Sequence, residues 1–286
     1  LGRVGEDYPQ EWLAKLERLN FDRRGITIIP EALDLRNFNA YPDPDTRQTN
    51  NPVSHFARLG LSFPRALLDY STPPPQLDSR TQLQPGSIRT IDIPPEYLDA
   101  TAVHICPMDY LTHHLLPSSF RQGNVQNITL DPSEGYMSPV FWEDIPSIVH
   151  GLTAFISSEE KVRTLFKGRS EDIWEMVETL AGYGCEIIII KRGNRGQYLY
   201  NAPSREKWAI PTYPSKIIDP TGVGDAFCGG FLAGYRLTYN PLKAALCGNI
   251  SASMVMAASA YDYALAAMPD LARARMEALE GRVRKI

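Results

Sequence analysis

Four short apolar runs in the middle of the chain constrain its fold most. They are residues 102–106, 125–130, 151–156 and 185–191, and the last contains the consecutive isoleucines Ile187 to Ile190. Strands that are apolar on both faces are typical of a parallel sheet covered on both sides. Helical patterns such as Ser170 to Tyr183 separate the runs. We therefore expect an α/β fold with a mainly parallel central sheet between two helical layers.

Polar stretches follow these strands along the chain. Two polar stretches come directly after an apolar run, at residues 131–133 and 157–160. A third, 191–196, begins at the last residue of its run, and a fourth occupies 219–225. Ligands of open parallel sheets bind outside the carboxyl ends of the strands. The sequence therefore predicts a ligand site at the edge of the sheet where these stretches meet.

The last of these stretches, Asp219 to Asp225, reads D-P-T-G-V-G-D and leads into a helix with apolar residues at helical spacing. The first N–H groups of a helix lack partners, and glycines allow them to converge on an anion. We expect the N–H groups of Gly222, Val223 and Gly224 to form such a cradle. Asp225 follows in the first turn, so its carboxylate would face the bound anion. A base beside a phosphate site predicts phosphoryl transfer to a hydroxyl.

An ordinary helix start with an acidic first-turn residue is the alternative interpretation of this loop. Two other phosphate motifs are excluded by inspection. The chain has no G-x-x-x-x-G-K-[ST], and Phe227 stands at the third glycine position of G-x-G-x-x-G. A hydrolase is disfavoured because neither G-x-S-x-G nor H-E-x-x-H occurs.

Charge and cysteine content argue against several other classes of protein. The net charge of -4 at pH 7, without a basic cluster among aromatic residues, argues against a nucleic-acid partner. The most apolar window, 242–260, contains Lys243 and Asn249, so no membrane span is expected. The four cysteines form no C-x-x-C pair, and the five histidines show no metal-ligand spacing. We expect reduced thiols in a cytoplasmic protein, with its histidines in loops or at the surface.

The N-terminal third begins with a strand–helix–strand pattern. Residues 1–7 indicate the end of a strand and a turn, 12–19 carry one apolar helix face, and Gly25 to Ile29 form a strand closed by Pro30. Residues 41–86 are rich in proline, aspartate, asparagine and serine, which is typical of irregular loops. We expect no regular structure there except a short segment at 56–61.

The stretch 219–225, with Gly229-Gly230-Phe231 behind it, resembles the C-terminal signature of the ribokinase/PfkB family of carbohydrate and nucleoside kinases. The resemblance implies a ribokinase-like three-layer sandwich with a small β lid, as one domain over residues 1–286. Residues 25–93 would hold the lid and an irregular proline-rich insertion. Residues 2–7 match the family's G-R-V-G-x-D element, which implies that this sequence lacks the first strands of the fold.

The same resemblance implies an activity, the ATP-dependent phosphorylation of a hydroxyl on a sugar-like or nucleoside-like small molecule. Asp225 would accept the proton of that hydroxyl, and the cradle would stabilise the phosphoryl group during transfer. Relatives often dimerise through the lid, so the resemblance implies a homodimer as well. Charge and hydropathy, as above, predict neither a nucleic-acid nor a membrane partner.

Further matches imply contacts with the nucleotide. Gly193 and Gly196 match a G-x-x-G turn that lies along ATP in the family, with Lys191 and Asn194 beside it. A glycine hairpin turn explains the same residues without a ligand. Asn249 matches a position that borders the adenine, and a buried asparagine satisfied by a neighbouring carbonyl is an equal alternative.

Metal contacts are implied at two places. Glu160 ends the motif Ser157-x-x-Glu160, which begins with asparagine in the family and helps to organise Mg²⁺ and phosphate there. A helix capping box explains the same residues and is the alternative. Asp219 and Thr221 match positions where some relatives bind a monovalent cation such as K⁺ through backbone oxygens.

The sequence also departs from the family pattern. Ser133 and Ser157 stand where the family has asparagine, and the arginine expected within 134–136 is missing. The insertion and the start of the chain at residues 1–2 resemble a divergent fungal branch, which includes proteins known for maintaining a killer virus. These features favour an alternative function, a catalytically weak kinase-like protein with a binding or assembly role. The intact Asp225 and its glycine cradle favour catalysis.

Overall fold

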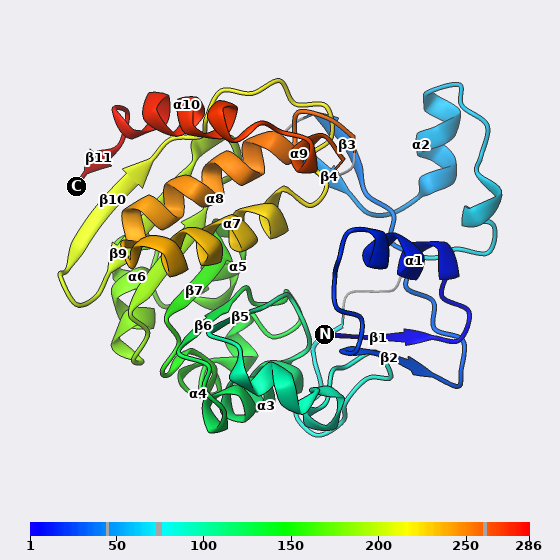
Figure 1. Ribbon diagram of the computed structural model, residues 1–286, viewed down its shortest axis with the longest axis horizontal. Helices are drawn as coiled ribbons and strands as arrows, with labels where there is room; N and C mark the ends of the chain where they lie inside the picture. The colour runs from blue at the N-terminus through cyan, green and yellow to red at the C-terminus, as the bar shows by residue number, and fades with distance from the viewer. Residues whose placement is uncertain (44–45, 73–75, 260–261) are drawn as a thin grey trace.

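Seven strands form the central sheet of the computed structural model, which describes residues 1–43, 46–72, 76–259 and 262–286 (Figure 1). Their order across the sheet is β11-β10-β9-β8-β7-β6-β5. The strands are β5 (Ala102–Ile105), β6 (Asn127–Leu130), β7 (Ala154–Ser158), β8 (Ile187–Lys191), β9 (Gln197–Asn201), β10 (Glu206–Ile210) and β11 (Arg284–Lys285).

The sheet has a parallel half and an antiparallel half. Strands β5 to β8 pair in parallel, whereas β8 to β11 pair in antiparallel fashion. The four parallel strands are those predicted from the apolar runs, so the predicted α/β fold is confirmed. The direction changes after β8 because only residues 192–196 connect it to β9, and a parallel return needs a much longer crossover.

Helices cover both faces of this sheet. In β8, Ile188 and Ile190 pack into the core on one face, while Ile187 and Ile189 pack into the core on the other. Because successive side chains of a strand point to opposite faces, this alternation requires three layers. The first face is covered by α3 (Tyr110–Gln122), α4 (Ile145–Val149), α5 (Glu159–Leu165) and α6 (Ile173–Gly182). The second is covered by α7 (Val223–Thr238), α8 (Pro241–Val255) and α10 (Pro269–Glu280).

Glycines allow α7 and α8 to pack in close contact. A Cβ at Gly230 would lie 2.3 Å from the Ser251 Oγ, and one at Gly234 would lie 2.7 Å from the Cβ of Cys247. These distances are too short for any larger residue. The close contact sets how α7 lies on the sheet, and therefore where its N-terminus points.

The N-terminal third forms two small sheets apart from the central one (Figure 1). Strands β1 (Gly2–Gly5) and β2 (Ile26–Ile29) pair in parallel, with α1 (Gln10–Arg18) between them in the chain, as the sequence predicted. Strands β3 (Ala40–Asp43) and β4 (Thr46–Gln48) pair in antiparallel fashion. The remaining helices are α2 (Pro52–Arg58) and α9 (Asp262–Leu265), with short 3₁₀ helices η1 (Arg65–Leu67), η2 (Thr90–Asp92), η3 (Pro95–Asp99), η4 (Pro139–Phe141) and η5 (Gly193–Arg195).

The prediction that residues 41–86 lack regular structure outside 56–61 was wrong for 41–43, 46–48, 52–55 and 65–67, and its residues 44–45 and 73–75 lie outside the described residues. Besides β3 and β4, α2 begins at Pro52, where the Asn51 side chain accepts the Ser54 N–H at 3.2 Å. The Phe56 ring then packs against the rings of Phe38 and Phe63. These aromatic contacts come from outside the helix, and composition alone does not reveal them.

No helix in the described part of the chain is both long enough and apolar enough to span a membrane.

Substituting Gly196 by alanine should destabilise the protein. The added Cβ would lie 2.0 Å from the Ile210 carbonyl oxygen, and the residue has a φ of +87°. We expect a loss of about 1–3 kcal/mol in the free energy of unfolding, measured by urea denaturation. Gly168→Ala is the control, because its φ is +78° but nothing lies within 4 Å of the new Cβ. An equal loss in both variants would contradict the close approach at Gly196.

Candidate active site

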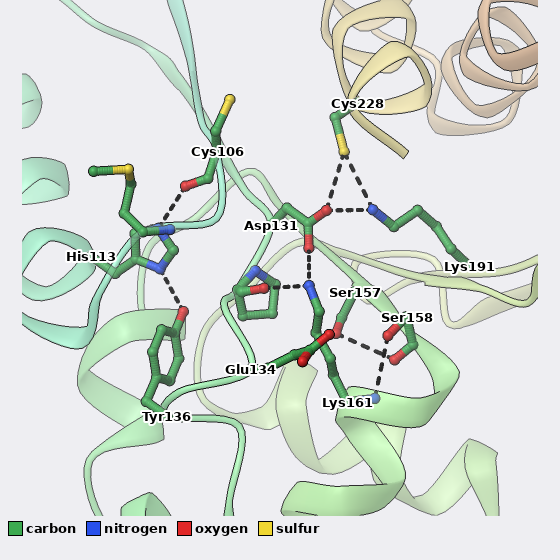
Figure 2. A network of polar contacts seen from close by, with 12 residues as sticks. Cys106, His113, Asp131, Glu134, Tyr136, Ser157, Ser158, Lys161, Lys191 and Cys228 are labelled. Carbon is green, nitrogen blue, oxygen red and sulfur yellow. Dashed lines mark hydrogen bonds and ion pairs between the residues drawn. The ribbon is translucent and has the colours of Figure 1, made fainter. Parts of the chain in front are cut away.

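A buried carboxylate joins three neighbouring strands at their carboxyl ends (Figure 2). Asp131 follows β6 and is 3% exposed. Lys161, from the first turn of α5, donates to its Oδ1 at 3.1 Å, and Lys191, the last residue of β8, donates to its Oδ2. Removing a carboxylate from water is costly unless it is paired, and here each oxygen has its own ammonium group. The cluster is therefore electrostatically stable although it is buried.

Cys228 of α7 covers this cluster from above. Its Sγ lies 3.8 Å from both the Lys191 Nζ and the Asp131 Oδ2. Burial raises the pKa of the Cys228 thiol to about 12, so the thiol is neutral near pH 7. Burial alone would lower the pKa of the Lys191 ammonium, but the charge of Asp131, its hydrogen bond to Lys191 and the charge of Asp225 favour the protonated form, so the pKa is raised. The Lys191 ammonium therefore stays charged.

The N-terminus of α7 lies next to the Lys191 ammonium. Gly222 is the N-cap with a φ of 77°, and a Cβ at Gly224 would lie 3.4 Å from the Lys191 Nζ. Within the described chain, the N–H groups of Gly224 and Asp225 donate to no backbone acceptor outside the helix, so they face the space in front of it. Val223 was expected to donate as well, but its N–H is taken by the Pro220 carbonyl at 3.3 Å. Of the three N–H groups expected to form the cradle, only that of Val223 is occupied; among the described residues those of Gly222 and Gly224 donate to no backbone acceptor, and the Asp225 N–H follows them.

Asp225 reaches a large cavity from the first turn of α7. The cavity has a volume of about 770 Å³. Partial burial raises the pKa of the Asp225 carboxyl, while the nearby Lys191 ammonium opposes that rise. The carboxyl is thus less acidic than a free aspartate, as a general base requires. The cavity is lined by Asn37, Phe38, Asn39, Arg47, Thr49, Tyr70, Thr72, Cys106, Pro107 and Asp225.

The turn after β8 is held by a second ionic cluster. Glu159, the first residue of α5, accepts from Arg163 at 2.7 Å, from Arg192 at 3.1 Å and from Arg195 at 2.7 Å. Arg192 and Arg195 flank Gly193 and Asn194 in the hairpin that joins β8 and β9. The hairpin interpretation of 191–196 is therefore confirmed, and its contact with a nucleotide stays a prediction.

The capping box predicted for Ser157 and Glu160 was wrong by one residue. The N-cap of α5 is Ser158, whose Oγ accepts the Lys161 N–H at 3.3 Å. Ser157 is fully buried near the end of β7, because the strand extends to Ser158, two residues further than expected. Glu160 is exposed at the second position of the helix. Its carboxylate is thus accessible and takes no part in the cap.

The side chains of Asp219 and Asn249 form hydrogen bonds with other residues of the protein. Asp219 accepts the Thr221 N–H at 2.9 Å and the Ser259 hydroxyl at 3.3 Å. Asn249 is buried, and its amide donates to Gln197 at 2.9 Å and to the Pro211 carbonyl, while it accepts the Tyr213 N–H. The structure thus favours the interpretation of Asn249 as a satisfied buried residue. Among the described residues, no three His, Cys, Asp or Glu side chains gather in a way that could hold a metal ion.

Sequence reasoning missed two residues at this site. Lys161 was not singled out, although it follows the predicted strand 151–156 closely enough to reach the sheet edge. His113 was expected at the surface but is fully buried, bonded to the Tyr136 hydroxyl at 2.6 Å and to the Cys106 carbonyl at 2.8 Å (Figure 2). Burial lowers the pKa of His113 to about 4, so it is neutral and holds the end of β5 in place.

Comparison with known proteins identifies the family. The sequence pattern described as pfkB family carbohydrate kinase matches residues 102–264. The chain is 34% identical over 234 residues to the cytidine kinase of Thermococcus kodakarensis, which covers 82% of this chain and 72% of that protein. These two matches show that the chain belongs to the pfkB family and is a carbohydrate or nucleoside kinase.

Solved structures confirm the ribokinase-like fold. The nucleoside kinase of Burkholderia thailandensis, determined in complex with inosine, has a TM-score of 0.69 at 17% identity over 98% of this chain and 81% of that one. A ribokinase II from E. coli, determined in complex with ATP and Mg²⁺, has a TM-score of 0.68 at 17% identity over 97% and 82% of the two chains.

Proposed function

We propose that this kinase transfers the γ-phosphoryl group of ATP to a hydroxyl of a nucleoside-like or sugar-like molecule, with a nucleoside as the first candidate. One observation carries the proposal. The Asp225 carboxyl faces a cavity large enough for a nucleoside, beside unpaired N–H groups and the Lys191 ammonium. The cytidine kinase relative supports the choice of a nucleoside.

The acceptor would bind in this cavity. Its walls combine amide, hydroxyl and guanidinium groups with the rings of Phe38 and Tyr70. Such a lining suits a flat base joined to a hydroxylated sugar, because rings cover the base while polar groups orient the hydroxyls. Most of the lining comes from residues 37–72, so the proposed lid region 25–93 would close over the acceptor. Arg47 of β4 bonds Glu134 at 3.0 Å and so connects this region to the loop after β6.

The proposed transfer balances as a single displacement. The acceptor oxygen bonds to the γ-phosphorus while the bond from phosphorus to the bridging oxygen breaks, and ADP leaves with that electron pair. The proton of the hydroxyl passes to Asp225. The N–H groups of Gly224 and Asp225 and the Lys191 ammonium stabilise the negative charge of the group in transit.

ATP would lie along the turn Gly193–Gly196, with Asn194 and Thr221 at its border. Asn249 would act indirectly, by holding the backbone of residues 211–213 beside this turn. An ATP and Mg²⁺ complex of the E. coli structure with the same fold supports this cofactor.

Mg²⁺ would be held mainly by the phosphates and by water, as is usual for this ion. Glu160 is exposed, lines the same hollow as Arg195 of the turn, and would contact the ion or its waters. The Asp219 carboxylate already accepts two hydrogen bonds, so a K⁺ ion would meet the backbone oxygens of Asp219 and Thr221. The alternative of a weakly catalytic binding protein is not favoured, because the family match and the long match to the cytidine kinase are both to kinases.

Substituting Asp225 by asparagine should remove the general base. We expect the rate of phosphoryl transfer from ATP to a nucleoside panel to fall by about 10²- to 10⁴-fold, with the binding of ATP retained. Asp270→Asn is the matched control, because Asp270 is also an aspartate in the first turn of a helix but is exposed on α10. A rate within a few-fold of wild type in the Asp225 variant would exclude this residue as the base.

The rate should fall on the acid side of the pH profile as Asp225 becomes protonated. Because its pKa is raised above the ordinary aspartate value, this acid limb should lie above that value as well. Lys191 lowers the pKa of Asp225, so Lys191→Met should move the limb to still higher pH. The measurement is kcat/KM against pH for both proteins. A shift of the limb to lower pH in the variant would contradict this electrostatic coupling.

A homodimer through the lid region is part of the proposal. Trp12 and Ile28 of the β1–β2 region are each 50% exposed, and Leu35 is 44% exposed. Burial of these side chains in a partner would supply the apolar area that an interface needs. Light scattering across a range of concentrations should give the mass of a dimer, and a monomer throughout would refute this part.

A further inference from the structure

We propose that Lys161 is a second positive contact for the phosphoryl group in transit, acting together with Lys191. The inference deepens the proposed function and rests on it. The juxtaposition that carries it is two ammonium groups, from α5 and from β8, bonded to the two oxygens of one buried carboxylate (Figure 2). The β8 ammonium also lies next to Gly224 at the N-terminus of α7.

Contacts at the first turn of α5 set the direction in which the Lys161 side chain extends. Its own N–H is capped by Ser158, and the preceding Glu159 is tied to Arg192 and Arg195 in the turn after β8. These contacts fix the first turn of the helix against the sheet edge. The side chain of Lys161 then extends to Asp131 and to the Pro132 carbonyl.

Both lysines are buried along their length. The side chain of Lys161 is 15% exposed and that of Lys191 is 17% exposed. Neither ammonium is therefore a freely hydrated surface charge. An ammonium carries three N–H donors, and Asp131 and Pro132 accept two of those of Lys161. The remaining donor is available for an oxygen of the transferred group.

The charge of the site explains why two ammonium groups are needed. Asp131 could be stabilised by one of them, so the second is in excess of what the buried carboxylate requires. Together with Asp225, the four groups sum to zero before the reaction. When Asp225 takes the hydroxyl proton, the same groups carry one net positive charge. This charge develops while the phosphoryl group is in transit, which is when it stabilises the transition state most.

The reaction itself is unchanged by this contact. The acceptor oxygen bonds to phosphorus, the bridging oxygen leaves with its electron pair on ADP, and the proton goes to Asp225. Lys161 and Lys191 give up no proton and act through their charge and hydrogen bonds alone.

The test is Lys161→Met in the full chain, assayed for ATP-dependent phosphorylation of a nucleoside. We expect kcat to fall by about 10²- to 10³-fold, with the KM for ATP changed by less than about threefold, because the contact strengthens in the transition state. Lys161→Arg should recover part of the rate, since it keeps the charge. Lys167→Met is the control, because Lys167 is exposed two residues beyond the end of α5. If Lys161→Met does not fold, Lys161→Gln keeps a donor toward Asp131 and removes the charge.

A binding measurement separates this inference from the proposed function. Titration calorimetry with MgADP and aluminium fluoride, which mimics the phosphoryl group in transit, should show weaker binding to Lys161→Met than to wild type. Affinity for MgADP alone should be equal in both. A wild type that phosphorylates a nucleoside while Lys161→Met keeps its rate would overturn the inference and leave the proposed function standing. A wild type without transfer activity would refute the proposed function. Equal binding of the mimic to both proteins would then refute the role of Lys161 as well.

Discussion

The ion pairs of Asp131 are the interaction on which the rest of this site depends. A carboxylate that is 3% exposed is tolerated because it is paired with ammonium groups, here one on each oxygen. The two lysines come from neighbouring elements, so the pairs also draw the ends of β6 and β8 and the start of α5 together. The result is a concentration of positive charge at the carboxyl edge of the sheet, in front of the N-terminus of α7.

The position of α7 depends on a different kind of contact. Gly230 and Gly234 let this helix pack tightly on α8, and Gly222 lets the chain turn into it with a positive φ. Backbone sterics therefore place the free N–H groups of Gly224 and Asp225 beside Lys191. Ion pairs hold the charged cluster and glycine packing places the N-terminus of α7, and the two lie side by side. Asp225, in the first turn of α7, lines the acceptor cavity.

Much of the fold and part of the site could be predicted from local sequence. The isoleucines 187–190 indicated a strand buried on both faces, and the glycine loop indicated the start of α7. Other predictions failed where a hydrogen bond that the sequence pattern does not reveal decides the outcome. Val223 was expected to bind the anion, but Pro220 accepts its N–H. The α5 cap is Ser158 instead of Ser157, because pairing with β8 extends β7 to Ser158, two residues beyond the expected end.

The sequence by itself determined the α/β architecture, the family signature and the place of Asp225 in the first turn of a helix. Each of these depends on spacing within a short stretch, which local periodicity and backbone sterics are enough to read. Only the tertiary structure decided that Lys161 reaches Asp131, that His113 is buried, and that Asn249 is satisfied by Gln197 and Pro211. The partners in these pairs lie 23 to 52 residues apart, so their contact exists only once the sheet and its helices have packed.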